Sequence, residues 1–300
     1  MINVITGSNG FSAKFLIEHI LLKKSSKIIG IDIQEDNNNE AIEYFSLRNF
    51  DKLEECLISQ SGEVTLYHLG GLIGNHKLPD LIKANVYWTS KYLNLCSKIK
   101  KIKMFVNIGS AAEYGEQKVM MINENLIPNP ISNYGISKDM QSKLVINYGR
   151  VYNLPVISLR TFNLIGPGLG DNLVVGKIIK EFNFLSEGKK NIIKIGRIDS
   201  KRDFIDIRDA VRIYSILAES DCFGSVINIA RGKSLEIREI INVCKKVYKK
   251  NPEIVSNFIS PKGQDLDFQF ADTHKMKKFT NNLQFITIEK SIEDMKNYGS

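Results

Sequence analysis

Short apolar segments alternate with longer segments of helical period through the first half of the chain, and this alternation limits the fold more than any other feature. It indicates a parallel sheet covered by helices, because parallel strands are joined by crossover helices. The expected strands are residues 2–6, 27–31, 64–69, 104–108 and 155–160. The expected helices are residues 11–23, 50–59, 81–98 and 134–152. We therefore predict an α/β fold with a doubly wound parallel sheet.

Residues 6–13 read Thr-Gly-Ser-Asn-Gly-Phe-Ser-Ala and connect the first expected strand to the first helix. In this spacing Gly7 permits a tight turn, Gly10 lets the backbone approach a pyrophosphate, and Ala13 lets the helix pack closely. Amide groups at the start of the helix can then hold the phosphates of a dinucleotide. The predicted cofactor-binding residues of this loop are Gly7, Asn9, Gly10 and Phe11.

Asp32 follows the second expected strand, at the position where dinucleotide-binding sheets carry an acidic residue. A carboxylate there can bond both ribose hydroxyls and repel a 2′-phosphate. The residue therefore favours NAD over NADP, and NADP stays possible. The alternative is that Asp32 only forms a turn at the end of the strand.

Tyr134 and Lys138 stand four residues apart and therefore share one face of an expected helix. An ammonium so placed can lower the pKa of the phenol and make it a proton donor or acceptor near neutral pH. Ser110 follows the preceding strand, at the carboxyl edge where open α/β sheets bind ligands. We predict that these three residues act on an alcohol or a ketone. The alternative is that Ser110 caps a turn and Tyr134 only packs.

The pattern is less regular after Arg160, where a Gly/Pro-rich turn is followed by shorter elements. Helices are expected at 173–185, 209–219, 237–248 and near the end, and strands near 192–195 and 226–229. We predict a Rossmann domain from residues 1–165 that also receives about residues 204–230. A smaller, interleaved substrate-binding lobe would comprise residues 166–203 and 231–300.

The composition is that of a soluble protein with a large core, since 43% of the residues are apolar. No segment approaches the ~18 consecutive apolar residues of a membrane span, and the first ten residues do not resemble a signal peptide. We therefore expect a cytoplasmic protein. The formal charge of +8 is spread over many polar faces, which indicates a solvated surface rather than nucleic-acid binding. The four cysteines lack zinc-site spacing, and we predict no metal and mostly buried thiols.

Six segments resemble the extended short-chain dehydrogenase/reductase pattern, the NAD-dependent epimerase/dehydratase family. They are residues 6–10, 68–71, 85–86, 110–115, 134–138 and 160–168. Within the family the chain is most similar to GDP-4-keto-6-deoxymannose reductases, through residues 109–115, 160–168 and 193–209. This resemblance implies a nucleotide-sugar substrate that binds between a sheet domain and a smaller lobe.

The resemblance also implies roles for individual residues. Ser110 and Tyr134 would contact the reacting oxygen of the sugar, Lys138 would hold the nicotinamide ribose, and Leu69 would contact the cofactor.

The implied substrate contacts lie in the second half of the chain. Asn163 would contact the substrate, and Arg202 would pair with its diphosphate, a task that suits a planar guanidinium. Lys180 is a second candidate for the diphosphate, and it fits equally well as a solvated lysine on an amphipathic helix.

The chain departs from the family pattern near both expected ligands. Gly70 and Gly71 replace two alanines, which predicts a looser loop beside the cofactor. Residues 46–47 lack the usual Asp-Leu pair on the adenine side, and residues 262–265 lack an arginine that often binds the nucleotide.

The dehydratase members of the family carry a Thr-Asp-Glu run that would fall on residues 110–112 here. Ala111 and Ala112 cannot act as acid or base, so elimination of water is not expected. Glu113 is interpreted as a pocket-lining or a structural carboxylate. The reactions that stay possible are reduction, oxidation and epimerisation of the sugar.

The preferred mechanism is hydride transfer to C4 of a nucleotide-linked 4-keto-6-deoxyhexose while Tyr134 delivers a proton to the oxygen. A 4-epimerase that retains NAD and a C4 dehydrogenase would use the same three residues, so the sequence does not separate them. A non-catalytic dinucleotide-binding regulator is the rival from another class. Such proteins commonly lose the tyrosine or the lysine, whereas this chain has both.

Residues 81–98 and 134–152 carry apolar residues on more than one helical face. In the resembled family this pair of helices builds a dimer contact, which implies a homodimer. Packing between the sheet and the second lobe would give the same pattern.

Overall fold

The computed structural model describes residues 1–23, 26–37, 39–189, 191–256, 270–281 and 283–298. In this part of the chain the central element is a seven-stranded parallel sheet in the order β11-β7-β5-β4-β1-β2-β3. Its strands are β1 (Ile2–Thr6), β2 (Lys27–Asp32), β3 (Glu43–Ser46), β4 (Val64–His68), β5 (Ile102–Ser110), β7 (Val156–Thr161) and β11 (Ser225–Ile229). The predicted doubly wound sheet is confirmed.

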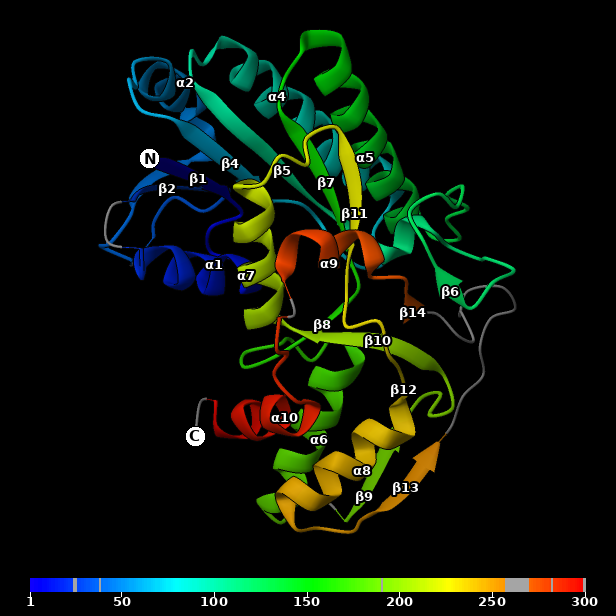
Figure 1. Ribbon diagram of the computed structural model, residues 1–300. Coiled ribbons are helices and arrows are strands. Elements are labelled where there is room, and N and C mark those ends of the chain that lie inside the picture. The colour runs from blue at the N-terminus through cyan, green and yellow to red at the C-terminus, as the bar shows by residue number, and fades with distance from the viewer. Residues whose placement is uncertain (24–25, 38, 190, 257–269, 282, 299–300) are drawn as a thin grey trace.

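Helices cover both faces of the sheet (Figure 1). On one face α1 (Phe11–Leu21) and α7 (Ile207–Ala218) bury a cluster of aliphatic side chains against β1, β7 and β11. On the other face α2 (Phe50–Ile58), α4 (Trp88–Lys98) and α5 (Asn133–Tyr152) bury a second cluster. The strands are apolar on both faces because both are covered, which explains their short continuous apolar runs in the sequence.

The strand order reverses between β1 and β4, which lie side by side with Thr6 opposite His68. In open α/β sheets the ligand crevice lies outside the carboxyl ends of the strands at such a switch point. Ser110 is the last residue of β5, the next strand along this edge. The topology therefore places the predicted cofactor loop and the predicted catalytic serine at one edge of the sheet.

The second lobe lies at the opposite end of the molecule from α2 and α4 (Figure 1). A sheet of β8 (Asn163–Ile165), β10 (Lys201–Asp206) and β12 (Ser234–Glu236) adjoins β9 (Ile192–Ile195) paired with β13 (Glu253–Ser256). Around these strands α6 (Val174–Ser186), α8 (Ile237–Tyr248) and α10 (Ile288–Asn297) bury a third apolar cluster. The chain then returns to the first part, because β11 is a strand of the main sheet and α7 packs on that sheet.

Several elements differ from those expected. The helix expected at 81–98 is divided into α3 (Leu78–Ile82), a π-helical turn (Lys83–Tyr87) and α4. The sequence analysis missed β3, β8, β10, β12 and β13, and the two-residue pair of β6 (Met121–Ile122) and β14 (Phe270–Ala271). All of these strands are short, and all except β6 and β14 carry charged or polar residues, so apolar periodicity does not detect them.

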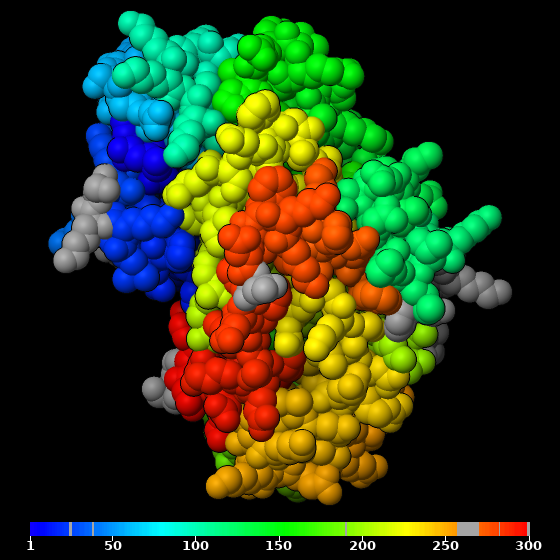
Figure 2. Space-filling view, viewed as in Figure 1, coloured from blue at the N-terminus to red at the C-terminus, as the bar shows by residue number. Residues whose placement is uncertain are grey.

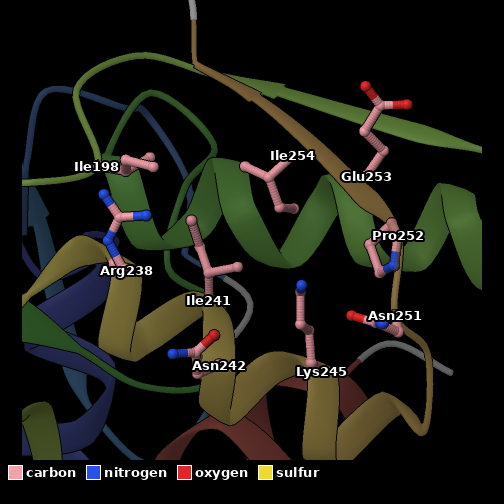
Figure 3. Close-up of a pocket in the computed structure, with 9 residues that line it drawn as sticks. All are labelled: Ile198, Arg238, Ile241, Asn242, Lys245, Asn251, Pro252, Glu253 and Ile254. Carbon is pink, nitrogen blue, oxygen red and sulfur yellow. The ribbon is translucent and has the colours of Figure 1, made fainter.

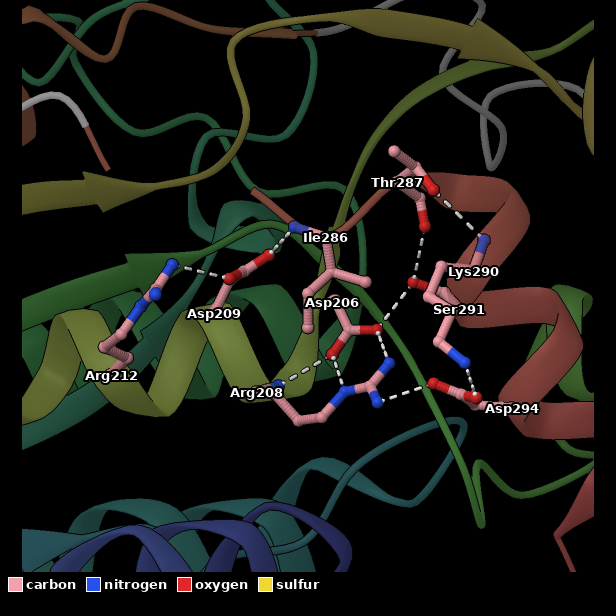
Figure 4. Close-up of polar contacts among 9 residues, drawn as sticks. All are labelled: Asp206, Arg208, Asp209, Arg212, Ile286, Thr287, Lys290, Ser291 and Asp294. Carbon is pink, nitrogen blue, oxygen red and sulfur yellow. Dashed lines mark hydrogen bonds and ion pairs between the residues drawn. The ribbon is translucent and has the colours of Figure 1, made fainter. Parts of the chain in front are cut away.

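An ionic cluster joins the C-terminal helix to the rest of the molecule (Figure 4). Arg208 in α7 holds both carboxylate oxygens of Asp206 at 2.9 and 2.8 Å and reaches Asp294 of α10 at 2.7 Å. The Ser291 hydroxyl donates to the same Asp206 carboxylate at 2.5 Å. On the face shown in Figure 2, α9 (His274–Thr280) packs on α7 and β11, and α10 packs on α6 and α8 of the second lobe.

Among the described residues no helix is both long and apolar enough to span a bilayer. Three of the four cysteines, Cys96, Cys222 and Cys244, are buried and Cys56 is partly buried, as predicted.

Candidate active site

The Gly-rich loop passes between the ends of β1 and β4 with little room to spare. Gly7 has a φ of +67°, and a methyl group at this position would lie 2.7 Å from the α-carbon of Gly70. Gly70 in turn donates its amide to the Thr6 hydroxyl at 2.9 Å. No side chain caps the start of α1, so its first amides face the loop without a competing partner. This arrangement fits a bound phosphate.

Asp32 lies beside this loop at the end of β2. Its carboxylate accepts the Asn9 amide at 3.0 Å and the Ile33 amide at 2.7 Å. Each oxygen keeps a free lone pair, because an ionised carboxylate has about four acceptor positions. The Asn9 side chain donates to Gln34 at 2.7 Å. The structure thus brings Asn9 and Asp32 together on the side of the loop where a ribose would lie.

Two apolar residues complete the predicted cofactor set. Phe11 and Leu69 are partly buried and pack against the cluster between the sheet and α1. The Phe11 ring meets that of Phe15 edge-on, at 5.6 Å between centroids. Both therefore lie next to the glycines of the two loops, Phe11 after Gly10 and Leu69 before Gly70.

The loop after β4 is closely packed, contrary to the looseness expected from its two glycines. The Asn85 side chain accepts the Leu72 amide at 2.7 Å and donates to the Leu72 carbonyl at 3.0 Å. A methyl group at Gly71 would lie 2.5 Å from the Asn85 side-chain oxygen. Asn85 also donates to Ser137 at 2.9 Å, one residue before Lys138. The glycines therefore make room for contacts that tie this loop to α5.

The candidate catalytic residues come from β5 and α5. The Ser110 hydroxyl accepts the Ala112 amide at 3.1 Å, which leaves its proton available to donate. Lys138 is 7% exposed, and its ammonium donates to the Ile108 carbonyl at 2.6 Å. Tyr134 lies one helical turn before Lys138, and the Ser110 side chain is near enough to its phenol to lower the pKa of that group. The three predicted side chains therefore converge at the carboxyl end of β5.

Burial dominates the protonation of this group. It raises the pKa of Tyr134 to about 12, although hydrogen bonding with Ser110 acts in the opposite direction. It lowers the pKa of Lys138 to about 8, and the negative charge of Glu113 partly offsets this. The expected lowering of the phenol pKa by Lys138 is thus wrong, because desolvation of the phenolate raises the pKa and outweighs the effect of Ser110.

Glu113 lies beneath Ser110 and is fully buried, so of its two interpretations the structural one holds. It accepts the Ser110 amide at 2.8 Å and the Arg160 guanidinium at 2.7 Å. Arg160 also lies over the Tyr114 ring at 4.4 Å. The sequence analysis did not identify this pair, although the S-x-x-E spacing of a capping box was present at Ser110.

The predicted substrate residues lie in the second lobe. Asn163 in β8 is exposed and donates to the Asp203 carbonyl of β10 at 3.1 Å. Arg202, the neighbour of Asp203, is partly exposed and donates to the Lys201 carbonyl at 2.8 Å. The structure therefore places Asn163 and Arg202 on paired strands.

The other substrate predictions fare differently. Lys180 lies on α6 in an exposed ion pair with Asp171, an arrangement that satisfies its charge at the surface. The segment 262–265, which lacks the expected arginine, lies outside the described residues. The residues that the structure describes contain no group of three or more metal-binding side chains.

A shallow groove of about 570 Å³ lies on the second lobe (Figure 3). It is lined by Ile198, Arg238, Ile241, Asn242, Lys245, Asn251, Pro252, Glu253 and Ile254. None of these is a predicted site residue, and most belong to α8 and β13 rather than to the sheet edge. The groove is therefore separate from the Ser110 site.

The fold and the site together define a dinucleotide-binding α/β enzyme. Residues 3–230 match the NAD dependent epimerase/dehydratase family, and the chain belongs to that family, the extended short-chain dehydrogenase/reductases. The fold resembles that of UDP-glucuronic acid 4-epimerase from Bacillus cereus in complex with UDP-glucuronic acid and NAD, with a TM-score of 0.86 at 24% identity. That likeness covers 99% of this chain and 98% of the other.

Two relatives are similar in sequence. GDP-6-deoxy-D-talose 4-dehydrogenase from Aggregatibacter actinomycetemcomitans is 25% identical over 300 residues, which cover 97% of this chain and 96% of that protein. GDP-6-deoxy-D-mannose reductase from Pseudomonas aeruginosa is 31% identical over 156 residues, or 51% of each chain. The family resemblance identified in the sequence is thereby confirmed.

Proposed function

We propose that this protein is a nucleotide-sugar oxidoreductase that reduces the C4 ketone of a GDP-linked 4-keto-6-deoxyhexose. The observation that carries the proposal is the convergence of Ser110, Tyr134 and Lys138 at the carboxyl end of β5. Ala111 and Ala112 follow the serine, so the site lacks the acid and base needed to eliminate water. The names of the two sequence relatives support a GDP-6-deoxyhexose and chemistry at C4.

In this proposal each residue has a separate task. The bound nicotinamide supplies a hydride to C4 of the sugar. Tyr134 donates its phenolic proton to the oxygen, so that the ketone becomes an alcohol. Ser110 donates a hydrogen bond to the same oxygen, and Lys138 binds the cofactor ribose. Fixed positions and buried donors supply most of the rate acceleration.

Ligand binding in this proposal follows the geometry of the two parts. Gly7, Asn9, Gly10 and Phe11 hold the dinucleotide, with Leu69 on its apolar side. Asp32 selects NADH over NADPH because a 2′-phosphate would meet its carboxylate.

The sugar nucleotide lies between the sheet edge and the second lobe in this proposal. Asn163 and Arg202 contact it from β8 and β10, and Arg202 pairs with the diphosphate. Lys180 reaches the diphosphate only if it leaves Asp171, and it is the weakest of the three contacts.

We also propose a homodimer formed through α4 and α5. Tyr87, Met140, Val151 and Tyr152 leave large apolar surfaces exposed on this side of the molecule. Where such side chains form one patch, they commonly mark a protein interface. Sedimentation equilibrium tests the assembly, and a monomer at micromolar concentration would contradict it.

The test of the function begins with the dinucleotide content of freshly purified protein after denaturation. GDP-4-keto-6-deoxymannose is then added with NADH or NADPH, and absorbance of the reduced nicotinamide is followed. We expect empty protein and one reduced cofactor consumed per ketosugar. Tyr134→Phe should abolish the reaction, whereas Tyr152→Phe, an exposed position on the same helix, should not.

Other outcomes point to the rival activities. Tightly held NAD with no net consumption would replace the reductase by a 4-epimerase. Reduction of NAD⁺ by a GDP-6-deoxyhexose, without reaction of the ketosugar, would make the protein a C4 dehydrogenase. Cofactor binding without turnover of any nucleotide sugar would indicate a regulator.

A further inference from the structure

We infer that Glu113, held by Arg160, is a positioning residue that fixes Ser110 and supplies the negative charge facing Lys138. The expected effect of Glu113 on kcat rests on the proposed function. Its expected effect on the charge of Lys138 does not. Glu113 has no exposed surface, so it acts through Ser110 and Lys138 rather than by touching the sugar.

The first observation is the short helical turn that follows β5. Ser110 and Glu113 form a capping box, in which Glu113 accepts the Ser110 amide at 2.8 Å. The Ser110 hydroxyl accepts the Ala112 amide at 3.1 Å. Main chain and hydroxyl of the serine are therefore both held, and the hydroxyl proton is left to point toward Tyr134 or a substrate oxygen.

The second observation is the space in which the carboxylate lies. Gly109 and Arg160 are opposite each other on β5 and β7. A methyl group on Gly109 would lie 2.4 Å from the Glu113 oxygen, so only glycine leaves room for the carboxylate there. Arg160 binds the other oxygen at 2.7 Å, and both side chains are almost fully buried. The sheet register, the glycine and the ion pair thus fix the position of the Glu113 carboxylate.

The third observation is the charge around Lys138. Burial lowers the pKa of its ammonium to about 8, and Glu113 is the group that raises it. The ammonium lies at the Ile108 carbonyl, and the Glu113 carboxylate lies against Gly109, the next residue of β5. The other charged or titratable groups nearby are Tyr134, one turn away on α5, Arg160 of β7, which is paired with Glu113, and His68 at the end of β4. His68 is buried with a pKa lowered to about 3, so it is neutral and adds no charge. Glu113 therefore favours the cationic form of Lys138.

The first experiment needs no substrate. Protein labelled with 13C at the lysine ε-carbon is titrated by NMR, and the Lys138 signal is identified by its loss in Lys138→Met. We expect Glu113→Gln to lower the Lys138 midpoint by about one pH unit or more, since an opposite charge at close range shifts a pKa by this amount. Glu116→Gln removes an exposed carboxylate three residues away and should leave the midpoint unchanged. An unchanged midpoint in Glu113→Gln would overturn the electrostatic role.

The second experiment separates charge from position. Glu113→Asp keeps the charge but withdraws it from the Ser110 amide. We expect its Lys138 midpoint to stay near that of the natural protein while kcat for the ketosugar falls up to about 100-fold, with KM little changed. A kcat equal to that of the natural protein would refute positioning of Ser110.

A purely structural role is tested by removing both buried charges. Glu113→Leu combined with Arg160→Met should restore a stable fold, because an apolar pair can replace a buried ion pair. We expect kcat to remain low, since the Ser110 amide loses its acceptor. Full recovery of kcat in this double variant would show that the pair only stabilises the fold. If the natural protein turns over no ketosugar, the proposed function fails, whereas the Lys138 titration still decides this inference.

Discussion

Gly7 and Gly70 approach each other so closely that a methyl group on Gly7 would lie 2.7 Å from the α-carbon of Gly70. The two glycines belong to the loops that follow β1 and β4, on either side of the point where the strand order reverses. Their contact leaves no room for a side chain at either position. The predicted phosphate loop therefore depends on two separate loops packing without side chains.

Replacing Gly7 by alanine should weaken both folding and cofactor binding. A left-handed φ costs a non-glycine residue about 1–2 kcal/mol, and the overlap with Gly70 adds to it. Gly188 is a matched control, since its φ is +73° and nothing lies within 4 Å of an added methyl group. We expect Gly188→Ala to lose only the conformational cost in urea unfolding and to bind NADH normally. Equal losses in the two variants would contradict the contact.

The same loops show what the sequence could and could not predict. Strand ends, the glycine spacing and the positions of Ser110, Tyr134 and Lys138 follow from local patterns, because each lies where a buried apolar strand meets a loop. The close packing of the loop that contains Gly70 could not be predicted from local patterns. It arises from Asn85, 13 residues after Leu72, whose side chain projects from a π-helical turn.

The second lobe was harder to predict for a different reason. Residues 201–206 read Lys-Arg-Asp-Phe-Ile-Asp, with four charged residues in a six-residue strand. Asp203 is nevertheless buried, because backbone amides of Arg231 and Gly232 bond its carboxylate at 3.0 and 2.9 Å. A buried carboxylate bonded by a distant turn leaves no periodic signal, so strands of this kind are visible only in the structure.

Lys138→Met should stabilise the protein while abolishing its activity. Below pH 8 the folded protein holds a buried ammonium whose pKa is about 8, against 10.5 for an ordinary lysine. That burial costs up to about 3 kcal/mol, a penalty that shrinks between pH 8 and 10.5 and is absent above. We expect urea unfolding at pH 7 to show the gain, and measurements at increasing pH to show it fading.

The control for this prediction lies on the same helix. Lys143 is exposed and paired with Asp139, so Lys143→Met should change the free energy of unfolding by less than about 1 kcal/mol. A Lys138→Met variant less stable than the natural protein at pH 7 would mean that the ammonium is held by more than the Ile108 carbonyl.

Asp32→Asn should shift the cofactor preference toward NADPH. The substitution preserves the shape of the side chain and removes the charge that a 2′-phosphate would meet. We expect the ratio of NADPH to NADH affinity to rise about tenfold, the scale of one close charge contact near a protein surface. Fluorescence titration of both cofactors measures this without substrate. Asp36→Asn, an exposed carboxylate further along the same loop, should leave the ratio unchanged.

Arg208→Met should loosen the attachment of α10 to α7 and β10 at a large cost in stability. The variant leaves the Asp206 carboxylate, 1% exposed, without its guanidinium, and an unpaired buried charge costs about 3–5 kcal/mol. Asp294→Asn removes only a partly exposed carboxylate from the same cluster and should cost under about 1 kcal/mol. Because Asp206 ends β10, which also carries Arg202, we expect Arg208→Met to weaken substrate binding more than NADH binding. Urea unfolding, limited proteolysis of α10 and the two affinities measure these effects, and similar stability of the two variants would show that the cluster does not anchor the helix.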